Sequence, residues 1–159
     1  SPRSAALLCI EGVSYFSQKK YNYAKKSLAA CIKIDPAYVD ALNIFGSLCQ
    51  ELGEHQLAVN NFRQVAALDS LNHNAFFNLA NALSKSGDSE SAIVVYQHSL
   101  KLNDEFCPSY NNMGNEHREF GNLDMVKYLV EEKGVDVRVI KEIKSWWNGD
   151  IKEYLRSVI

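Results

Sequence analysis

The sequence lacks the features that mark several classes of protein. None of its apolar runs approaches the roughly 18 residues of a membrane-spanning helix, so we expect no association with a membrane. Lys and Arg number 17 against 19 Asp and Glu, and the formal net charge of -2 disfavours nucleic-acid binding, which needs clustered positive charge. Only three prolines occur, and no low-complexity linker divides the 159 residues. The chain starts with Ser1 instead of methionine, so we expect it to be part of a longer protein.

The sequence also has little that would bind a metal or perform catalysis. Its four cysteines form no C-x-x-C pair and no Cys/His cluster with the spacing of a zinc site. We therefore expect buried free thiols in a reducing, cytoplasmic location, with no metal and no cofactor. The histidines and carboxylates show no catalytic spacing, and no glycine-rich phosphate loop follows a strand, which predicts that the chain is not an enzyme. The cysteines are Cys9, Cys31, Cys49 and Cys107.

The sequence does contain a repeat with a period of 34 residues. Four ladders of residues share this period, and each ladder suits a pair of packed helices. Small residues in the first two ladders allow the helices to approach closely, and large residues in the third fill the space between pairs. Glycines in the fourth mark turns, where a positive φ is cheap only for Gly. The ladders are Gly12, Gly46, Ala80 and Gly114; Ala24, Ala58 and Ala92; Leu28, Phe62 and Tyr96; and Gly53, Gly87 and Gly121.

Together these residues resemble the tetratricopeptide repeat, whose pattern places a large residue, Leu-Gly, an aromatic, Ala, an aromatic and Pro at fixed offsets. In the first unit Leu8, Gly12, Tyr15, Ala24 and Pro36 occupy such positions. The resemblance covers residues 5–121 and implies an all-α fold, an α-solenoid of about three and a half units built from antiparallel helix pairs. We expect helices near residues 4–17, 21–34, 38–51, 55–68, 72–85, 89–102 and 106–119.

The remaining residues, 122–159, follow a different pattern. The stretch GNLDMVKYLVEEKGVDVR, residues 121–138, resembles the second helix and exit loop of an ankyrin repeat, where Gly-x-Leu-x-x-Val-x-x-Leu-Leu precedes a Gly-x-Asp-Val loop. We expect an ankyrin-like end, or alternatively a simple pair of capping helices, that continues the array. Trp146 and Trp147 are expected to cover this end of the solenoid, and a role as interface anchors is the alternative.

Asparagine is frequent in the helices expected for the third and fourth units, although it is a poor helix former. Asn78 and Asn81 share one helix face, and Asn112 and Asn115 repeat them 34 positions later. The resemblance places these residues on the concave wall of the superhelix. The pattern is similar to the asparagine ladder in the repeat domains of O-linked N-acetylglucosamine transferases, which hold extended protein substrates. An amide both donates and accepts, so a row of amides suits a peptide backbone. Alternatively, the asparagines solvate the wall or bond to one another across units.

The groove positions of the tetratricopeptide family, carried onto this chain, give the candidate site residues. The peptide-binding groove is expected at Asn43, Asn74, Phe77, Asn78, Asn81, Asn111, Asn112, Asn115 and Arg118. An apolar end of the groove is expected at Cys9, Val13, Phe16 and Ile44, which suits either a hydrophobic part of a ligand or a preceding repeat. Chaperone-binding members of the family clamp a terminal carboxylate with Lys and Arg. The corresponding positions here supply no fixed positive charge, so we expect no such ligand.

These observations favour a non-enzymatic adaptor or scaffold that binds an extended peptide segment of a partner protein in the concave groove. A self-associating assembly scaffold, for instance a homodimer, is one alternative. A regulatory domain that recruits substrates to a larger enzyme is another. The mass of the protein in solution over a concentration series separates the first two readings, because only self-association produces a saturating dimer.

Overall fold

The computed structural model describes residues 4–117 and, beyond them, only residues 127, 130–131, 134, 153–154 and 156–158. Residues 4–117 form α-helices joined by short turns, at bounds within one or two residues of those predicted. No strand occurs among the described residues, and the predicted all-α class is confirmed. The helices are α1 (Ala5–Ser17), α2 (Tyr21–Ile34), α3 (Val39–Glu51), α4 (His55–Leu68), α5 (His73–Lys85), α6 (Ser89–Leu102) and α7 (Cys107–His117).

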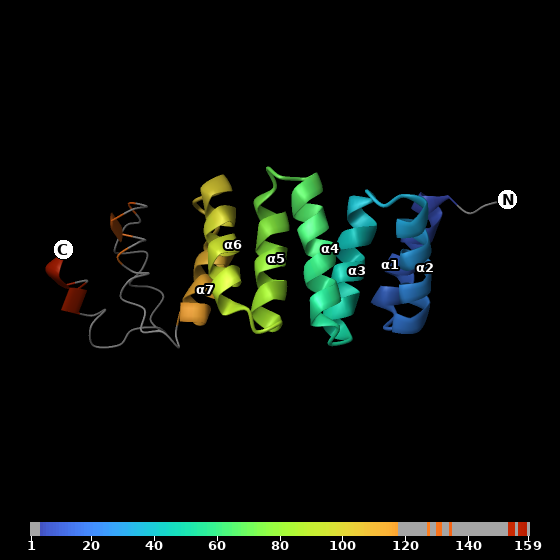
Figure 1. The fold of residues 1–159 in the computed structure, drawn as a ribbon, viewed down its shortest axis with the longest axis horizontal. Coiled ribbons are helices and arrows are strands. Elements are labelled where there is room, and N and C mark those ends of the chain that lie inside the picture. Colours follow the sequence, from blue (N-terminus) through green and yellow to red (C-terminus); the bar gives the residue numbers. More distant parts are fainter. Residues whose placement is uncertain are drawn as a thin grey trace.

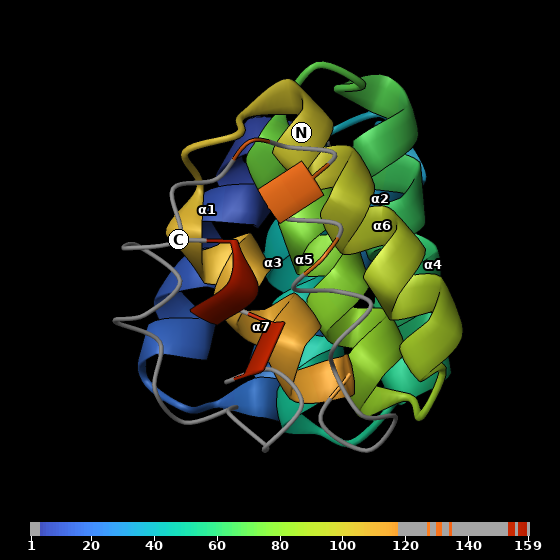
Figure 2. The same ribbon diagram turned by 90° about the vertical axis from the view of Figure 1, so that its left-hand side faces the viewer.

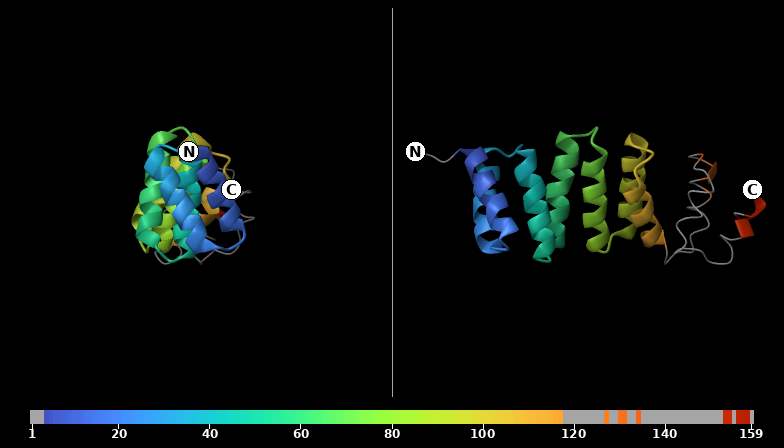
Figure 3. Two further views of the ribbon diagram at one scale, coloured as in Figure 1. Left: turned by 90° about the vertical axis from the view of Figure 1, so that its right-hand side faces the viewer. Right: turned by 180° about the vertical axis from the view of Figure 1, so that it is seen from behind.

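The helices stand in a row in chain order and form an elongated array (Figure 1), which has the same appearance from behind (Figure 3). Viewed along the long axis, the odd-numbered helices lie on one side and the even-numbered helices on the other (Figure 2). This two-layered arrangement of antiparallel pairs is the predicted α-solenoid. Within the part of the chain that the structure describes, no helix is long and apolar enough to cross a bilayer.

The two helices of each pair meet where a small residue faces a large one. A methyl group added at Gly12 would lie 2.5 Å from the Cγ atom of Leu28, and one added at Gly46 would lie 2.9 Å from the Cζ atom of Phe62. In the third unit Ala80 and Tyr96 occupy these two positions and are both buried. The helices therefore approach as closely as the first ladder predicts, because a side chain on the first helix would displace the large residue of the second. The third ladder was expected between pairs, but its large residues face the small residues inside each pair.

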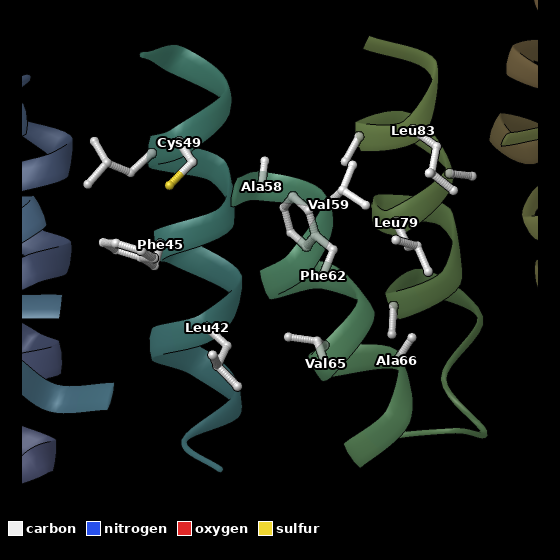
Figure 4. Packing of buried hydrophobic residues seen from close by; sticks show 14 of the residues in the cluster. Leu42, Phe45, Cys49, Ala58, Val59, Phe62, Val65, Ala66, Leu79 and Leu83 are labelled. Carbon is white, nitrogen blue, oxygen red and sulfur yellow. The ribbon is translucent and has the colours of Figure 1, made fainter. Parts of the chain in front are cut away.

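The core continues between pairs without a break. Side chains of α4 lie between α3 and α5, with Phe62 near the centre of the view in Figure 4. Leu42 and Phe45 contribute from α3, and Leu79 and Leu83 contribute from α5; all are buried. Each pair thus covers the apolar face of its neighbour, so the stability of one unit depends on the next.

The turns inside the helix pairs require a left-handed backbone. Gly53 has φ 73° and Gly87 has φ 89°, as the fourth ladder predicts. Lys19 lies at the equivalent position of the first unit and also has a positive φ, of 57°. The positive φ of Lys19 could not be predicted from the sequence, because a lysine does not indicate a left-handed turn. Gly121, the last member of the ladder, lies outside the described residues.

The expectation of buried thiols holds for three of the four cysteines. Cys9, Cys31 and Cys49 are buried and free. Cys107 is free but exposed, and for this residue the prediction was wrong. It is the first residue of α7, and its Sγ atom lies 3.5 Å from the carbonyl oxygen of Glu105 in the preceding turn instead of entering the core.

The predicted ankyrin-like or capping end, residues 122–159 with Trp146 and Trp147, lies outside the described residues except at the few positions named above. Among those positions, the hydroxyl of Tyr154 donates a hydrogen bond of 2.7 Å to the carboxylate of Glu131. Burial and this carboxylate together raise the pKa of Tyr154 to about 12.

Candidate binding groove

Two hollows open on the side of the odd-numbered helices, where the predicted groove residues lie. The first has a volume of about 420 Å³ and combines side chains of α3, α5, α6 and α7. We call it the polar hollow, since amides, hydroxyls and charged groups line it. Its residues are Gln50, Asn81, Ser84, Lys85, Tyr96, Asn112, Asn115 and Glu116.

A hydrogen-bond network joins the third and fourth units in the polar hollow. The Oδ1 atom of Asn81 accepts hydrogen bonds from the hydroxyl of Tyr96, at 2.6 Å, and from the Nδ2 atom of Asn112, at 2.7 Å. The hydroxyl of Ser84 also donates to the carboxylate of Glu116. Burial raises the pKa of Tyr96 to about 12, so its hydroxyl remains a donor at neutral pH. Asparagines of neighbouring units therefore do bond to one another, which is one of the alternatives that the sequence left open.

The network leaves several polar atoms of the hollow available. The Nδ2 atom of Asn81 and the Oδ1 atom of Asn112 make no hydrogen bond to any described residue, and Asn115 is exposed. The Nε2 atom of Gln50 is buried and has no hydrogen-bond partner among the described residues. The polar hollow therefore offers both donors and an acceptor to a ligand.

The second hollow, also of about 420 Å³, lies between α1 and α3. We call it the apolar hollow. Three of the four residues predicted for the apolar end line it, together with the predicted groove residue Asn43. The Oδ1 atom of Asn43 is buried without a hydrogen-bond partner among the described residues. The lining residues are Cys9, Ile10, Val13, Tyr38, Asp40, Asn43 and Ile44.

The other predicted site residues that the structure describes do not line either hollow. Phe16, expected at the apolar end, packs its ring 6.0 Å from that of Tyr21 at the start of α2. Phe77 is half-buried and packs against the rings of Tyr96 and Phe106, with centroids at 6.1 and 5.2 Å. Asn78 is half-buried, and Asn74 and Asn111 are exposed. Arg118 lies outside the described residues.

The set of predicted site residues did not include several that line the polar hollow. Tyr96 belongs to the ladder of large core residues, and only its hydroxyl, absent from Leu28 and Phe62 at the same position, could have indicated a second role. Glu116 occupies a position that holds Leu48 and Ala82 in earlier units, so the change to a charged residue was the available signal. In the apolar hollow, Tyr38 comes from the turn before α3, which groove positions counted along helices do not include.

The charge of the region and its lack of metal ligands limit the chemistry available. Residues 35–117 contain ten Asp or Glu and three Lys or Arg, so this part of the solenoid is acidic. Lys85 is the basic residue that lines the polar hollow, and Asp40 is the acidic residue that lines the apolar hollow. No group of three or more His, Cys, Asp or Glu residues suited to a metal ion occurs in the described parts of the chain. The groove suits binding through amides and apolar contacts.

The chain matches the family model described as "Tetratricopeptide repeat" at residues 5–38, 39–70 and 73–106. No curated protein matches it. Among solved structures it resembles MamA, with 23% identity, a TM-score of 0.75, and coverage of 89% of this chain and 83% of that one. It also resembles the first TPR of Spaghetti (RPAP3) bound to the HSP90 peptide SRMEEVD, with 20% identity, a TM-score of 0.68, and coverage of 74% and 93%.

A further similar structure is a mutant O-GlcNAc transferase of Thermobaculum terrenum, with 23% identity and a TM-score of 0.62. The match covers 72% of this chain and 22% of that one, so this chain spans about a fifth of the transferase. At such identities these likenesses establish the fold and nothing more specific.

Proposed function

We propose, from the premise that this chain belongs to the tetratricopeptide repeat family, that the polar hollow binds the main chain of an extended segment of a partner protein. One observation carries this proposal: the Nε2 atom of Gln50, in the lining of the hollow, is a buried donor without a partner among the described residues. A buried polar group left unpaired costs about 1–3 kcal/mol. A carbonyl oxygen of a bound peptide would remove that cost.

The bond between Asn81 and Asn112 supports the same function. It holds an amide of α5 against an amide of α7, and one donor and one acceptor of the pair have no partner among the described residues. An extended main chain presents N–H and C=O groups in alternation, and each needs the opposite kind of partner. Amides that are already held in place lose little side-chain freedom on binding, so more of the interaction contributes to affinity.

The comparisons support this class of function. The RPAP3 repeat domain, which shares the fold, is described with a bound peptide. Its peptide ends in acidic residues, whereas the polar hollow here contains Glu116 beside Lys85, so we propose a different ligand. The binding of an internal, extended segment needs no cluster of positive charge, and it makes the chain a non-enzymatic adaptor or the recruiting part of a larger protein.

The test is a selection from a displayed library of random decapeptides, followed by fluorescence anisotropy with the enriched peptides. The double variant Gln50→Ala, Asn115→Ala should bind these peptides at least tenfold more weakly, because it removes the unpaired donor and an exposed amide. The matched control, Asn74→Ala with Asn111→Ala, also removes two amides from the odd-numbered helices, but neither residue lines the hollow, so its affinity should be unchanged. Equal affinity of both double variants would disprove the proposal.

A further inference from the structure

We infer that the apolar hollow selects partner segments in which a large apolar residue is adjacent to a basic residue. This inference rests on the proposed function, because it assigns the sequence preference of the segment whose main chain the polar hollow binds. The variants that test it change other residues, Ile10 of α1 and Asp40 of α3, so the two proposals can fail separately.

The first argument is a change of polarity along the groove at equivalent repeat positions. One position holds Ile10, Ile44, Asn78 and Asn112 in the four units, and another holds Val13, Ser47, Asn81 and Asn115. The groove wall is therefore apolar in the first unit, mixed in the second, and built from amides in the third and fourth. Ile10 and Val13 are 66% and 39% exposed, so a ligand can still bury much of their surface.

The second argument is a pair of unpaired amide atoms on one helix. The Oδ1 atom of Asn43 and the Nε2 atom of Gln50 are both buried without partners among the described residues, and both belong to α3. They are seven residues apart, which is two helical turns, so they lie on one face at a spacing of about 10 Å along the axis. About three residues of an extended chain span that distance. One segment can thus donate an N–H to Asn43 and accept from Gln50.

This spacing connects the two hollows. The residue whose N–H reaches Asn43 places its side chain in the apolar hollow, beside Ile10, Val13 and Ile44. An apolar side chain is favoured there, because a polar one would lose its water without gaining a hydrogen bond from the aliphatic groups.

The third argument concerns charge. Asp40 lines the apolar hollow, where it is exposed and close to Ile44 in the sequence of α3. No other described residue of the lining is charged, since the rest have aliphatic, thiol, amide or phenol side chains. A basic side chain next to the apolar one can therefore pair with the carboxylate of Asp40, whereas an acidic one is repelled by it. Because Asp40 is exposed, this preference should weaken as salt is added.

The inference is tested with the same random decapeptide library. The enriched peptides should share an apolar residue beside Lys or Arg. Ile10→Asn, which copies the residue of the third unit, should weaken binding of these peptides by about tenfold. The control Leu7→Asn makes the same kind of change on α1, at a residue 46% exposed that does not line the hollow, and should leave the affinity unchanged. Asp40→Asn should weaken binding several-fold at low salt and have no effect at high salt.

The outcomes separate this inference from the proposed function. Enriched peptides that lack the apolar and basic pair, yet bind more weakly to the variant Gln50→Ala, Asn115→Ala, would overturn the inference and leave the proposed function in place. Equal losses for Ile10→Asn and Leu7→Asn would also overturn the inference. A library from which no peptide is enriched would overturn both.

Discussion

Lys19 adopts a backbone conformation that the other described units assign to glycine. Its φ of 57° compares with 73° at Gly53 and 89° at Gly87. This left-handed conformation raises the energy of a residue with a Cβ atom by about 1–2 kcal/mol. The packing of α1 against α2 must supply that energy, because the turn between them has to close at the same place as in the other units.

Replacement of Lys19 by glycine should therefore stabilise the protein. The change removes the strain but adds freedom to the unfolded chain, so the expected net gain is about 0.5–1 kcal/mol in the free energy of unfolding. Urea denaturation measures it. The control makes the opposite change, Gly53→Ala. The added methyl group would meet no atom within 4 Å, so the expected loss of about 1 kcal/mol in the free energy of unfolding would come from the backbone alone. A destabilised Lys19→Gly variant would contradict this account.

The cysteines differ in exposure, which predicts their order of reaction. Burial raises the pKa of Cys9 and Cys31, and raises that of Cys49 to about 11, whereas Cys107 is exposed. Since the thiolate is the reactive form, iodoacetamide at about pH 8 should modify Cys107 first and the other three only after unfolding. Mass spectrometry of the native protein counts the modified thiols. The variant Cys107→Ser should remain unmodified on the same timescale, and rapid reaction of Cys9 would contradict the prediction.

At the level of single residues, the sequence predicted positions better than partners. The period of 34 placed Asn81 and Asn112 on one wall, because a repeat fixes which face each residue occupies. It could not show that these two amides would bond to each other, since that depends on the distance between α5 and α7. The free donor of Gln50 was missed for a related reason: whether a glutamine is paired depends on what surrounds it, and a pattern along the chain does not contain that information.

Within each helix pair, the contact between one small and one large residue sets the separation of the helices. At Gly12 the neighbour is the branched Cγ atom of Leu28, at 2.5 Å from an added methyl, and at Gly46 it is the edge of the Phe62 ring. The sequence predicted the close approach at the small residues, because a repeated small residue marks a tight helix contact. It placed the large residues between pairs, since a period along the chain does not show which helix a side chain faces.

Gly12→Ala should destabilise the protein by about 1–3 kcal/mol, the usual cost of overpacking a close helix contact. Thermal unfolding followed by circular dichroism measures the loss. The double variant Gly12→Ala, Leu28→Ala tests the cause, because the smaller residue at 28 leaves room for the new methyl group. The cost of Gly12→Ala should then fall well below its value beside Leu28, a coupling that a double-mutant cycle reports. Equal costs in both backgrounds would mean that Leu28 is not the obstacle.

At the scale of the whole molecule, each helix pair contacts only its neighbours in the row. Among the described helices, α1 and α2 contact one neighbouring pair, and large apolar residues such as Leu7 and Ile34, 46% and 55% exposed, belong to them. The middle helices are covered on both sides, and residues such as Leu48 and Phe62 are buried there. The described array should therefore open from this end.

Hydrogen exchange should show this gradient. Backbone amides of α3–α5 are expected to exchange most slowly, and those of α1 and α2 to exchange faster by at least tenfold. Mass spectrometry after proteolysis resolves the helices. The variant Gly12→Ala should speed exchange in α1 and α2 while α5 keeps its protection. Exchange at one common rate in all helices would show that the array opens as a single cooperative unit, contrary to this expectation.

The bond between Asn81 and Asn112 has a mechanical consequence for the groove. A hydrogen bond of 2.7 Å fixes the separation of α5 and α7 within a narrow range, since it weakens steeply when stretched. Across the apolar hollow, Ile10 and Val13 of α1 face Ile44 of α3. Contacts between aliphatic side chains have no preferred direction. The groove thus has a stiff half and a compliant half. Partners that differ in bulk would be accommodated at α1, while the amides at α5 and α7 would keep their main chains in one fixed position.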